Sequence, residues 1–413
     1  MKITKNTVIN LFSYVKNEIN QNDTVSMCTH RSSDKARGTY FCEIVLADIV
    51  LAWRRTVMAS PCDSVTGNLA AVLHGKLDIR LEKIAVPELE ENEVLLAMGS
   101  VGICGSDLKY WIEGKCGIFT LGQPMVMGHE GSGTVARVGP GVKSLTIGDR
   151  VAVEPGVPCR KCALCKKGRY NLCKKICFCA TPPDDGNLCR YYKHPADFCF
   201  KLPDQVSLDE GALLEPLAVA IYSCRRGNVA LGTKVLVCGS GPVGILTMLV
   251  AKQMGASKVL ITDIDDIRLE MANRMGADLT LKVTSDDSMC LAKQIEVMMG
   301  GQPEVSIECS GADLSYATAI HATFPGGCVV TVARHKNSGD IPLNHAATKE
   351  VDIKGIFRYA NCYPAALDFV TNSGVDLTPL ITHHFNLMNT TSAFEAARSR
   401  DAHAVKVMIH CNK

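Results

Sequence analysis

The sequence predicts an α/β protein that joins a small β-rich domain to a domain built on a six-stranded parallel sheet. Two observations carry this prediction. The chain has 413 residues, which is long for one domain, and 47% of them are hydrophobic, which is enough for two buried cores. Near Thr233 the pattern changes from short β-rich runs between glycine turns to a repeated order of strand and helix, which is typical of a parallel sheet.

The β-rich part is expected to extend from residue 68 to residue 217. Its short runs of β-favouring residues alternate with Gly-containing turns, as in a small antiparallel domain. The predicted strands are Leu69–Val72, Glu93–Ala97, Gly133–Val138 and Arg150–Val153. Residues 154–201 contain many cysteines and are expected to form a loop-rich lobe, and Leu208–Arg226 is expected to be a helix.

The parallel-sheet part is expected to extend from residue 218 to residue 357. Short apolar runs predict its strands, and the segments that follow the first and second strands have helical character. The predicted strands are Lys234–Cys238, Val259–Thr262, Leu279–Lys282, Val305–Cys309, Cys328–Val332 and Val351–Ile356. The first strand is followed by a predicted helix that continues to Met254, and the second by a predicted helix over Ile267–Met275.

Glycines follow the first of these strands in the order G-x-G-x-x-G. Gly239, Gly241 and Gly244 would let the backbone and a helix N-terminus approach a pyrophosphate, although alone they could equally mark a tight turn. The next strand is followed by Asp263, whose carboxylate can accept hydrogen bonds from ribose hydroxyls. It would repel a 2′-phosphate, so NAD is predicted rather than NADP. Arg268 either stacks beside the adenine or is a solvated helix charge.

Charge and composition exclude several classes of function. The 44 Lys and Arg residues balance 42 Asp and Glu residues, so nucleic-acid binding is not predicted. No apolar run is long enough to span a bilayer, so no membrane association is predicted. The 20 cysteines of so long a chain favour free thiols and metal ligands, which predicts a cytoplasmic protein.

Residues 1–67 fit neither domain pattern, and we expect a poorly ordered extension whose residues 1–57 are dispensable for catalysis.

Four cysteines have the spacing of a structural zinc site. Cys159, Cys162, Cys165 and Cys173 form the pattern C-x2-C-x2-C-x7-C, which can close a tetrahedron of thiolates around Zn²⁺. A closed shell leaves no position for substrate, so this site is predicted to stabilise the lobe. The alternative is four unrelated thiols.

A second group of possible ligands is more widely spaced. Cys104, His129 and Glu130 offer a thiolate, an imidazole and a carboxylate, a set that an open catalytic zinc could use, and Glu215 lies far downstream. By spacing alone, a buried cysteine and a structural histidine remain the more frequent interpretation.

Several long strings carry a resemblance to a known family. They are Val101–Asp107, Tyr110–Trp111, Gly128–Glu130, Gly148–Ala152, Gly168–Leu172, Ala180–Cys189, Glu215–Leu217 and Gly355–Tyr359. Through them, from about Asn68 onward, the chain resembles the zinc-dependent medium-chain dehydrogenases, and the Ala180–Cys189 string resembles their polyol-oxidising members. The resemblance implies a GroES-like fold for the β-rich catalytic domain, a Rossmann fold for the parallel sheet, and a return of residues 358–413 to the first domain.

The resemblance also implies a reaction and its metal. It implies NAD-dependent oxidation of sorbitol or a similar polyol at C2 to a ketose, and the reverse, by hydride transfer from a zinc-bound alkoxide. Cys104, His129 and Glu130 would then hold the catalytic zinc, with Glu215 near it through water. Together with the four-cysteine site, this gives two zinc ions per chain.

Substrate, coenzyme and assembly follow from the same likeness. The polyol hydroxyls would lie against Tyr110, Glu215, Arg358 and Tyr359. The residues implied to contact NAD, besides the glycines, are Val243, Asp263, Arg268, Val332, Ala333, Arg334, Ile356, Phe357 and Arg358. A homotetramer is implied as the assembly.

Two departures and two alternatives stay open. Lys109 stands where a relative often has histidine beside the substrate tyrosine, so no proton relay is assigned to it. Val332–His335 lacks the Gly-rich turn common beside the nicotinamide, which predicts altered coenzyme affinity. The alternatives are a xylitol or secondary-alcohol dehydrogenase, and a catalytically silent NAD-binding structural protein.

Overall fold

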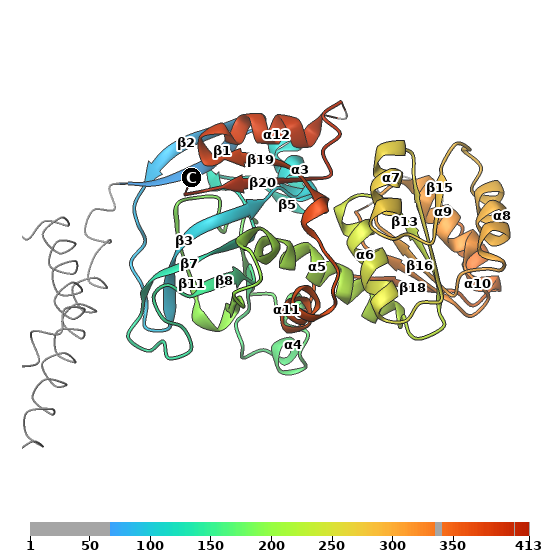
Figure 1. Ribbon diagram of the computed structural model, residues 1–413, viewed down its shortest axis with the longest axis horizontal. Coiled ribbons are helices and arrows are strands. Elements are labelled where there is room, and N and C mark those ends of the chain that lie inside the picture. Colours follow the sequence, from blue (N-terminus) through green and yellow to red (C-terminus); the bar gives the residue numbers. More distant parts are fainter. Residues whose placement is uncertain (1–66, 335–340, 400, 413) are drawn as a thin grey trace, which may run out of the picture. The chain divides into compact units, whose positions relative to one another are not determined.

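The computed structural model describes residues 67–334, 341–399 and 401–412 (Figure 1). The expected extension at residues 1–67 lies outside the described residues except for Gly67, and so does His335. The predicted fold class is confirmed, because one sheet is mostly antiparallel and a separate six-stranded sheet is parallel throughout.

A mostly antiparallel sheet, here called the catalytic sheet, is the centre of the first domain. Its strands are β3 (Glu93–Gly102), β7 (Glu130–Val138), β8 (Arg150–Val153), β11 (Tyr191–Pro195), β12 (Cys199–Lys201), β19 (Ile381–Asn386) and β20 (Lys406–His410). The order is β12-β8-β7-β3-β20-β19, and β11 also pairs with β3. The inward side chains of β3, among them Leu96 and Met98, are fully buried in the core of this domain.

Smaller sheets, helices and turns complete this domain. A three-stranded sheet has the order β2-β1-β6, and two further antiparallel pairs are β4 with β5 and β9 with β10. The strands are β1 (Asn68–Gly75), β2 (Asp78–Ile84), β4 (Lys115–Cys116), β5 (Phe119–Thr120), β6 (Met125–Val126), β9 (Gly156–Val157) and β10 (Cys177–Phe178). The helices are α3 (Gly105–Glu113), α4 (Ala163–Lys166), α11 (Tyr363–Asn372) and α12 (Thr390–Arg398), with 3₁₀ turns at Tyr170–Leu172, Ala196–Phe198, Thr378–Leu380 and Leu387–Asn389.

The parallel sheet, here called the coenzyme sheet, has the order β15-β14-β13-β16-β17-β18. Its strands are β13 (Lys234–Cys238), β14 (Lys258–Asp263), β15 (Leu279–Lys282), β16 (Val305–Glu308), β17 (Cys328–Thr331) and β18 (Asp352–Gly355). Its helices are α6 (Pro242–Gln253), α7 (Asp266–Arg274), α8 (Ser288–Met299), α9 (Asp313–Ala322) and α10 (Leu343–Thr348). Each of the predicted strands is present. The strand order reverses between β13 and β16, and in open α/β sheets ligands bind at the carboxyl ends of the strands at such a point.

Helix α5 (Leu208–Gly227) connects the two sheets (Figure 1). It packs against β3, β7 and β8 of the catalytic sheet, and against β16 and β17 of the coenzyme sheet and the neighbouring helix α6. Its start is set by a capping box, in which Ser207 and Glu210 satisfy each other's backbone N–H groups. The expected domain boundary between residues 217 and 218 falls inside this helix. Both domains therefore depend on the position of α5.

The end of the chain contributes β19 and β20 to the catalytic sheet, where β20 pairs with β3 and β19 pairs with β20. Neither strand is among those predicted from the sequence. All five residues of β20 are buried, so it lacks the alternation of polar and apolar residues by which a half-buried strand is recognised. It also contains Lys406, a residue type that is seldom buried.

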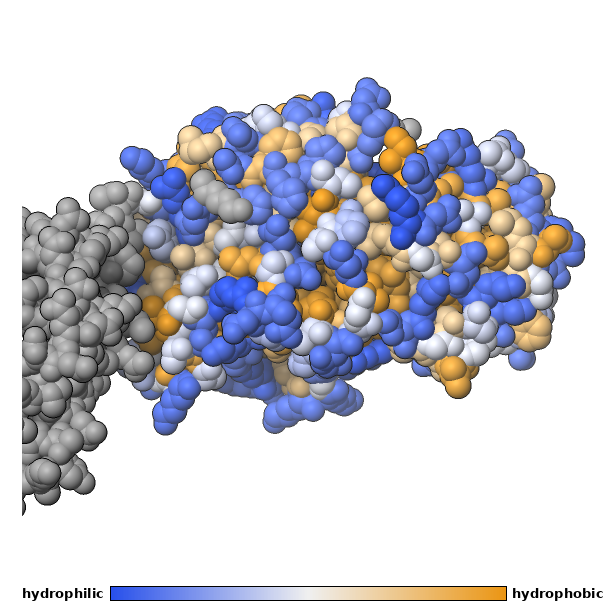
Figure 2. All heavy atoms as spheres, viewed as in Figure 1, coloured by the Kyte–Doolittle hydropathy of each residue, from blue (hydrophilic) through white to orange (hydrophobic). Residues whose placement is uncertain are grey.

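Charged and apolar side chains are mixed on the surface. On the face in Figure 2, hydrophilic side chains cover most of the described area and apolar ones are scattered among them. Among the residues that the structure describes, no helix is long and apolar enough to cross a membrane.

Candidate active site

A cavity of about 610 Å³ lies between the catalytic sheet and the carboxyl ends of the coenzyme sheet. Residues of α3 and the start of β7 line it from the catalytic domain, and the segments that follow β13, β17 and β18 line it from the coenzyme domain. Glu215 of α5 also lines it. A concave site at the point where the strand order reverses is where a dinucleotide and a small substrate can meet.

Cys104, His129 and Glu130 lie together at one wall of this cavity. One donor atom of each lies within 4.8 Å of the donor atoms of the other two. Glu130 begins β7 and pairs with Gly102 of β3, where a Cβ atom would collide with the Glu130 carboxylate. A thiolate, an imidazole and a carboxylate beside a cavity can hold Zn²⁺ and leave one coordination position open.

Asp107 holds two of these candidate ligands in place. Its Oδ1 lies 3.2 Å from Nδ1 of the His129 ring, and its Oδ2 accepts a hydrogen bond of 3.0 Å from the backbone N–H of Cys104. A carboxylate beside Nδ1 leaves Nε2 for a metal ion, an arrangement that is common behind zinc ligands. Asp107 is part of the string Val101–Asp107, but no role was predicted for it from the sequence.

Lys406 holds the third candidate ligand. Its Nζ donates to both carboxylate oxygens of Glu130, at 2.8 and 2.6 Å, and both side chains are buried. Burial alone would lower the pKa of Lys406, but the Glu130 carboxylate raises it above its usual value, so the amine stays charged. Lys406 was not predicted from the sequence, because a lone lysine is normally a surface residue.

Glu215 reaches the cavity from α5. Burial raises the pKa of this carboxyl to about 7, while His129 opposes the shift and Glu130 adds to it. Tyr359 lies beside Glu215, and burial together with that carboxylate raises the pKa of the phenol well above its usual range. Tyr359 is not among the residues that line the cavity, and its buried hydroxyl has no partner of hydrogen-bond geometry within the described chain. Of the predicted substrate contacts, it is the one set back from the cavity.

Arg358 lines the cavity in a conformation that its surroundings enforce. Its φ of +54° is rare for a residue with a side chain. The guanidinium lies 3.5 Å from the centre of the Phe178 ring and 4.7 Å from that of Phe357, and it donates to Oγ1 of Thr181 at 3.0 Å. Burial lowers the pKa of Arg358 to about 10. The aromatic rings and the hydroxyl fix a cationic donor at the cavity wall.

Tyr110 and Lys109 of α3 line the same cavity. Burial is the main cause that raises the pKa of Tyr110 to about 12, so its hydroxyl remains a hydrogen-bond donor at neutral pH. Across the cavity, Arg334 donates to the carbonyl oxygen of Cys116 at 2.8 Å and so links the coenzyme domain to β4.

The predicted glycine turn connects β13 to α6. Gly239 has a φ of +101°, and a Cβ atom at Gly244 would collide with the carbonyl oxygen of Gly239. Around the position of a Cβ atom at Gly241, no atom lies within 4 Å, which leaves room for a pyrophosphate at the N-terminus of α6. The other predicted coenzyme contacts that line the cavity are Val243, Arg268, Val332, Ala333, Arg334, Ile356, Phe357 and Arg358.

Asp263 is the last residue of β14 and lies in a second hollow of about 380 Å³. Its Oδ2 accepts a hydrogen bond of 2.6 Å from the backbone N–H of Ser240, inside the glycine turn. Arg268 lines both hollows, so it lies where the two meet. Arg398 and His403 also line the second hollow. Neither was predicted to lie there, because both are far in the sequence from any dinucleotide motif.

The four-cysteine segment folds into one cluster. The sulfur atom of Cys162 lies 3.4 Å from that of Cys165 and 3.8 Å from that of Cys173, and the sulfur atoms of Cys159 and Cys165 are 3.9 Å apart. Four thiolates around one Zn²⁺, with bonds of about 2.3 Å, are about 3.8 Å apart. A disulfide would bring two sulfur atoms to about 2.0 Å. Backbone N–H groups of Lys161 and Cys162 lower the pKa of Cys159 to about 6, whereas burial and the neighbouring thiols raise that of Cys165 to about 12.

Comparison with known proteins agrees with this architecture. Residues 90–204 match the alcohol dehydrogenase GroES-like domain, and residues 242–372 match the zinc-binding dehydrogenase domain. The sorbitol dehydrogenase of Rattus norvegicus is 54% identical over 355 residues, which are 86% of this chain and 98% of that protein.

Two solved structures extend the comparison. The 2R,3R-butanediol dehydrogenase of Bacillus subtilis is 31% identical, with a TM-score of 0.75 over 84% of this chain and 100% of that one. The L-idonate 5-dehydrogenase of Escherichia coli is 28% identical, with a TM-score of 0.77 over 84% of this chain and 98% of that one. The chain therefore belongs to the zinc-dependent medium-chain dehydrogenases and, within them, to the sorbitol dehydrogenase family.

Proposed function

We propose that this protein oxidises sorbitol or a closely similar polyol at C2 to the ketose, with NAD as the hydride acceptor, and that it also catalyses the reverse reaction. The observation that carries this proposal is the meeting of Cys104, His129, Glu130 and Glu215 with a dinucleotide-binding turn in one cavity. The similarity to the sorbitol dehydrogenase of Rattus norvegicus supports the choice of substrate.

The candidate metal ligands and their neighbours would prepare the site for an alcohol. When bound there, Zn²⁺ supplies a Lewis acid that lowers the pKa of a hydroxyl group in its open position. Asp107 orients the imidazole of His129, and Lys406 offsets part of the negative charge of the ligands. The ligand geometry is therefore fixed before substrate arrives, and little reorganisation accompanies the reaction.

Glu215 is the group best suited to hold the proton that leaves the substrate hydroxyl. With a pKa of about 7, it is partly protonated and partly ionised near neutral pH, as an efficient acid–base group should be. The reaction releases one proton for each hydride that is transferred, so a carboxylate at this position can accept that proton before it reaches solvent.

Polar donors at the cavity wall would orient the remaining hydroxyls of the polyol. Tyr110 and Arg358 line the cavity, and Arg358 is fixed by Phe178 and Thr181. A site whose buried polar groups pair with substrate hydroxyls rejects analogues that lack them. This supports a polyol over a simple secondary alcohol, and we place Tyr359 in a supporting position behind Glu215.

The coenzyme would lie along the glycine turn with its adenosine end at Asp263. A carboxylate there accepts from ribose hydroxyls and repels a 2′-phosphate, which supports NAD over NADP. The nicotinamide end would contact the segments that follow β17 and β18.

NADH formation with a panel of alcohols tests the proposal. We expect the rate with sorbitol to exceed clearly the rate with 2-propanol, and the ratio of sorbitol to xylitol to identify the preferred polyol. A protein that binds NADH but forms none from any polyol would be the structural protein of the alternative interpretation. Faster turnover of 2-propanol than of either polyol would favour a secondary-alcohol dehydrogenase.

We also propose that the protein acts in the cytoplasm as a homotetramer. The cysteines that the structure describes are free, which suits a reducing compartment. The family resemblance supports the tetramer, and sedimentation of the purified protein tests it.

A further inference from the structure

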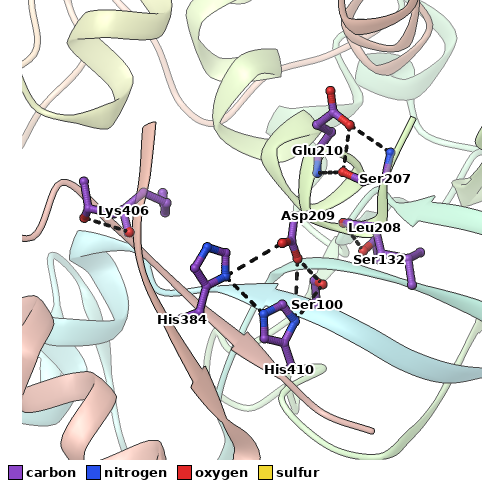
Figure 3. A network of polar contacts seen from close by, with 10 residues as sticks. Ser100, Ser132, Ser207, Leu208, Asp209, Glu210, His384, Lys406 and His410 are labelled. Atoms are coloured by element: carbon purple, nitrogen blue, oxygen red, sulfur yellow. Dashed lines mark hydrogen bonds and ion pairs between the residues drawn. The ribbon is translucent and has the colours of Figure 1, made fainter. Parts of the chain in front are cut away.

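A third group of potential metal ligands lies outside both sites described above. Asp209 is in the first turn of α5, His384 is on β19 and His410 is the last residue of β20. One donor atom of each lies within 4.8 Å of the donor atoms of the other two. Figure 3 shows both imidazole rings and the hydroxyl of Ser100 converging on the Asp209 carboxylate.

The contacts of the two histidines suit a shared ion. Nδ1 of His384 lies 3.1 Å from Nε2 of His410, and the two rings are stacked with an angle of only 3° between their planes. Two imidazole nitrogens on one tetrahedral Zn²⁺, each about 2.0–2.1 Å from the ion, are about 3.3 Å apart. The separation is therefore close to that of two ligands of the same ion, although it also fits a single N–H···N hydrogen bond.

Asp209 supplies the third donor and supports one of the rings. Its Oδ2 lies 3.8 Å from Nδ1 of His384, and its Oδ1 lies 3.6 Å from Nδ1 of His410. The hydroxyl of Ser100 donates to Oδ1 at 2.5 Å and lies 3.4 Å from Nδ1 of His410. A carboxylate and a hydroxyl at Nδ1 of His410 leave Nε2 to face His384, which is how supporting groups commonly orient a metal-binding histidine.

An ion can enter this group from solvent. The side chain of His384 is 49% exposed, whereas that of His410 is only 11% exposed. Two imidazoles and one carboxylate favour zinc and similar transition metals over Ca²⁺ or Mg²⁺, which prefer oxygen ligands throughout. Three protein donors also leave room for a water molecule on the ion.

We infer that Asp209, His384 and His410 form a third zinc site, distinct from the cavity site and from the four-cysteine site. An ion there links the first turn of α5 to His384 within β19 and to the last residue of β20. Helix α5 also carries Glu215, and strand β20 also carries Lys406. The third site therefore connects two elements that contribute to the active site. Its binding therefore stabilises the folded catalytic domain.

Zinc content per chain tests this inference. The parent protein and the variants His384→Ala and Asp209→Asn are dialysed to equilibrium against Zn²⁺ alone. Bound zinc is then measured by elemental mass spectrometry. Each variant is expected to hold one zinc ion fewer per chain than the parent. Because the readout is a difference, it does not depend on how completely the other two sites fill. Added Zn²⁺ should also raise the melting temperature of the parent more than that of His384→Ala.

His383→Ala is the matched control, because His383 neighbours His384 on β19 but contacts Thr382 at 3.0 Å instead of the cluster. It should keep the zinc content of the parent. Circular dichroism establishes that each variant is folded, and the isosteric Asp209→Asn replacement guards against a loss of metal caused by misfolding alone. Equal zinc content in the parent and both cluster variants would overturn the inference and leave the 3.1 Å contact as a hydrogen bond. A loss in His383→Ala as large as that in His384→Ala would also overturn it.

Discussion

The four sulfur atoms of the Cys159–Cys173 lobe come from one short segment. Cys104 and the pair His129-Glu130 come from two segments, and Glu130 also depends on Lys406 of the last strand. The lobe has a full set of thiolates and offers no position to a substrate. The cavity site has three candidate ligands, an ion-paired carboxylate and an open side. A stabilising site can therefore be built from one segment, while a reactive site needs several elements held in register.

The largest expected effect comes from removing a ligand at the cavity. Cys104→Ser or His129→Ala should lower turnover by about three orders of magnitude or more, because metal activation of the alcohol is worth several kcal/mol. NADH binding, followed by its fluorescence, should change little. Cys290→Ser, at an exposed thiol of α8, is the control. Near-parental turnover in either ligand variant would refute the assignment of the reactive site.

Lys406→Met tests the link between the cavity site and the end of the chain. Without zinc, the buried Glu130 carboxylate would lose its only cationic hydrogen-bond donor among the described residues, and unfolding free energy should fall by about 3–5 kcal/mol. With zinc bound, the loss should be smaller because the ion compensates the carboxylate. Urea unfolding of chelator-treated and zinc-loaded protein measures both values. Lys201→Met, which removes the ion pair between an exposed lysine and Asp149, should cost about 1 kcal/mol or less. Equal losses with and without zinc would contradict the proposed arrangement.

Cys162→Ser tests the other side of the comparison. It should remove one zinc ion per chain and lower the melting temperature. A cross-link that closes a loop as long as residues 159–173 stabilises the folded state by about 3 kcal/mol. Turnover of the folded fraction should stay close to that of the parent. Cys177→Ser replaces an exposed thiol just outside the cluster and should change neither zinc content nor stability. Unchanged melting of Cys162→Ser would remove the stabilising role of the lobe.

Asp263→Ser should have the smallest effect, confined to coenzyme choice. Removing the carboxylate should lower the ratio of kcat/KM with NAD to kcat/KM with NADP by about tenfold, which corresponds to about 1.4 kcal/mol. Asp286→Ser, at an exposed carboxylate that does not line this hollow, should leave the ratio unchanged. Parent protein that used NADP better than NAD would show that Asp263 does not select the coenzyme.

The same contrast explains what the sequence could predict. The four-cysteine cluster, the coenzyme sheet and the glycine turn follow from local spacing and periodicity, and the structure forms all three. The spacing of Cys104, His129 and Glu130 left a structural interpretation open until the family resemblance was considered. Their proximity depends on the pairing of β3 with β7, which is a tertiary event.

The residues that the sequence did not reveal act across large separations in the chain. Lys406 is far from Glu130 in sequence, and His410 and His384 meet Asp209 only because β20 pairs with both β3 and β19. No periodic pattern marks such residues, since each is a single polar side chain in an element of another character. Asp107 lay inside a recognised string, and its position three residues after Cys104 was the one available signal.

Chelator titration of the parent protein, with zinc content and NADH formation from sorbitol measured in the same samples, tests the central claim most directly. The account predicts that activity disappears with the loss of one zinc ion per chain and returns when Zn²⁺ alone is added back. Protein that is free of zinc, still folded, and still forms NADH from sorbitol at the parental rate would contradict it.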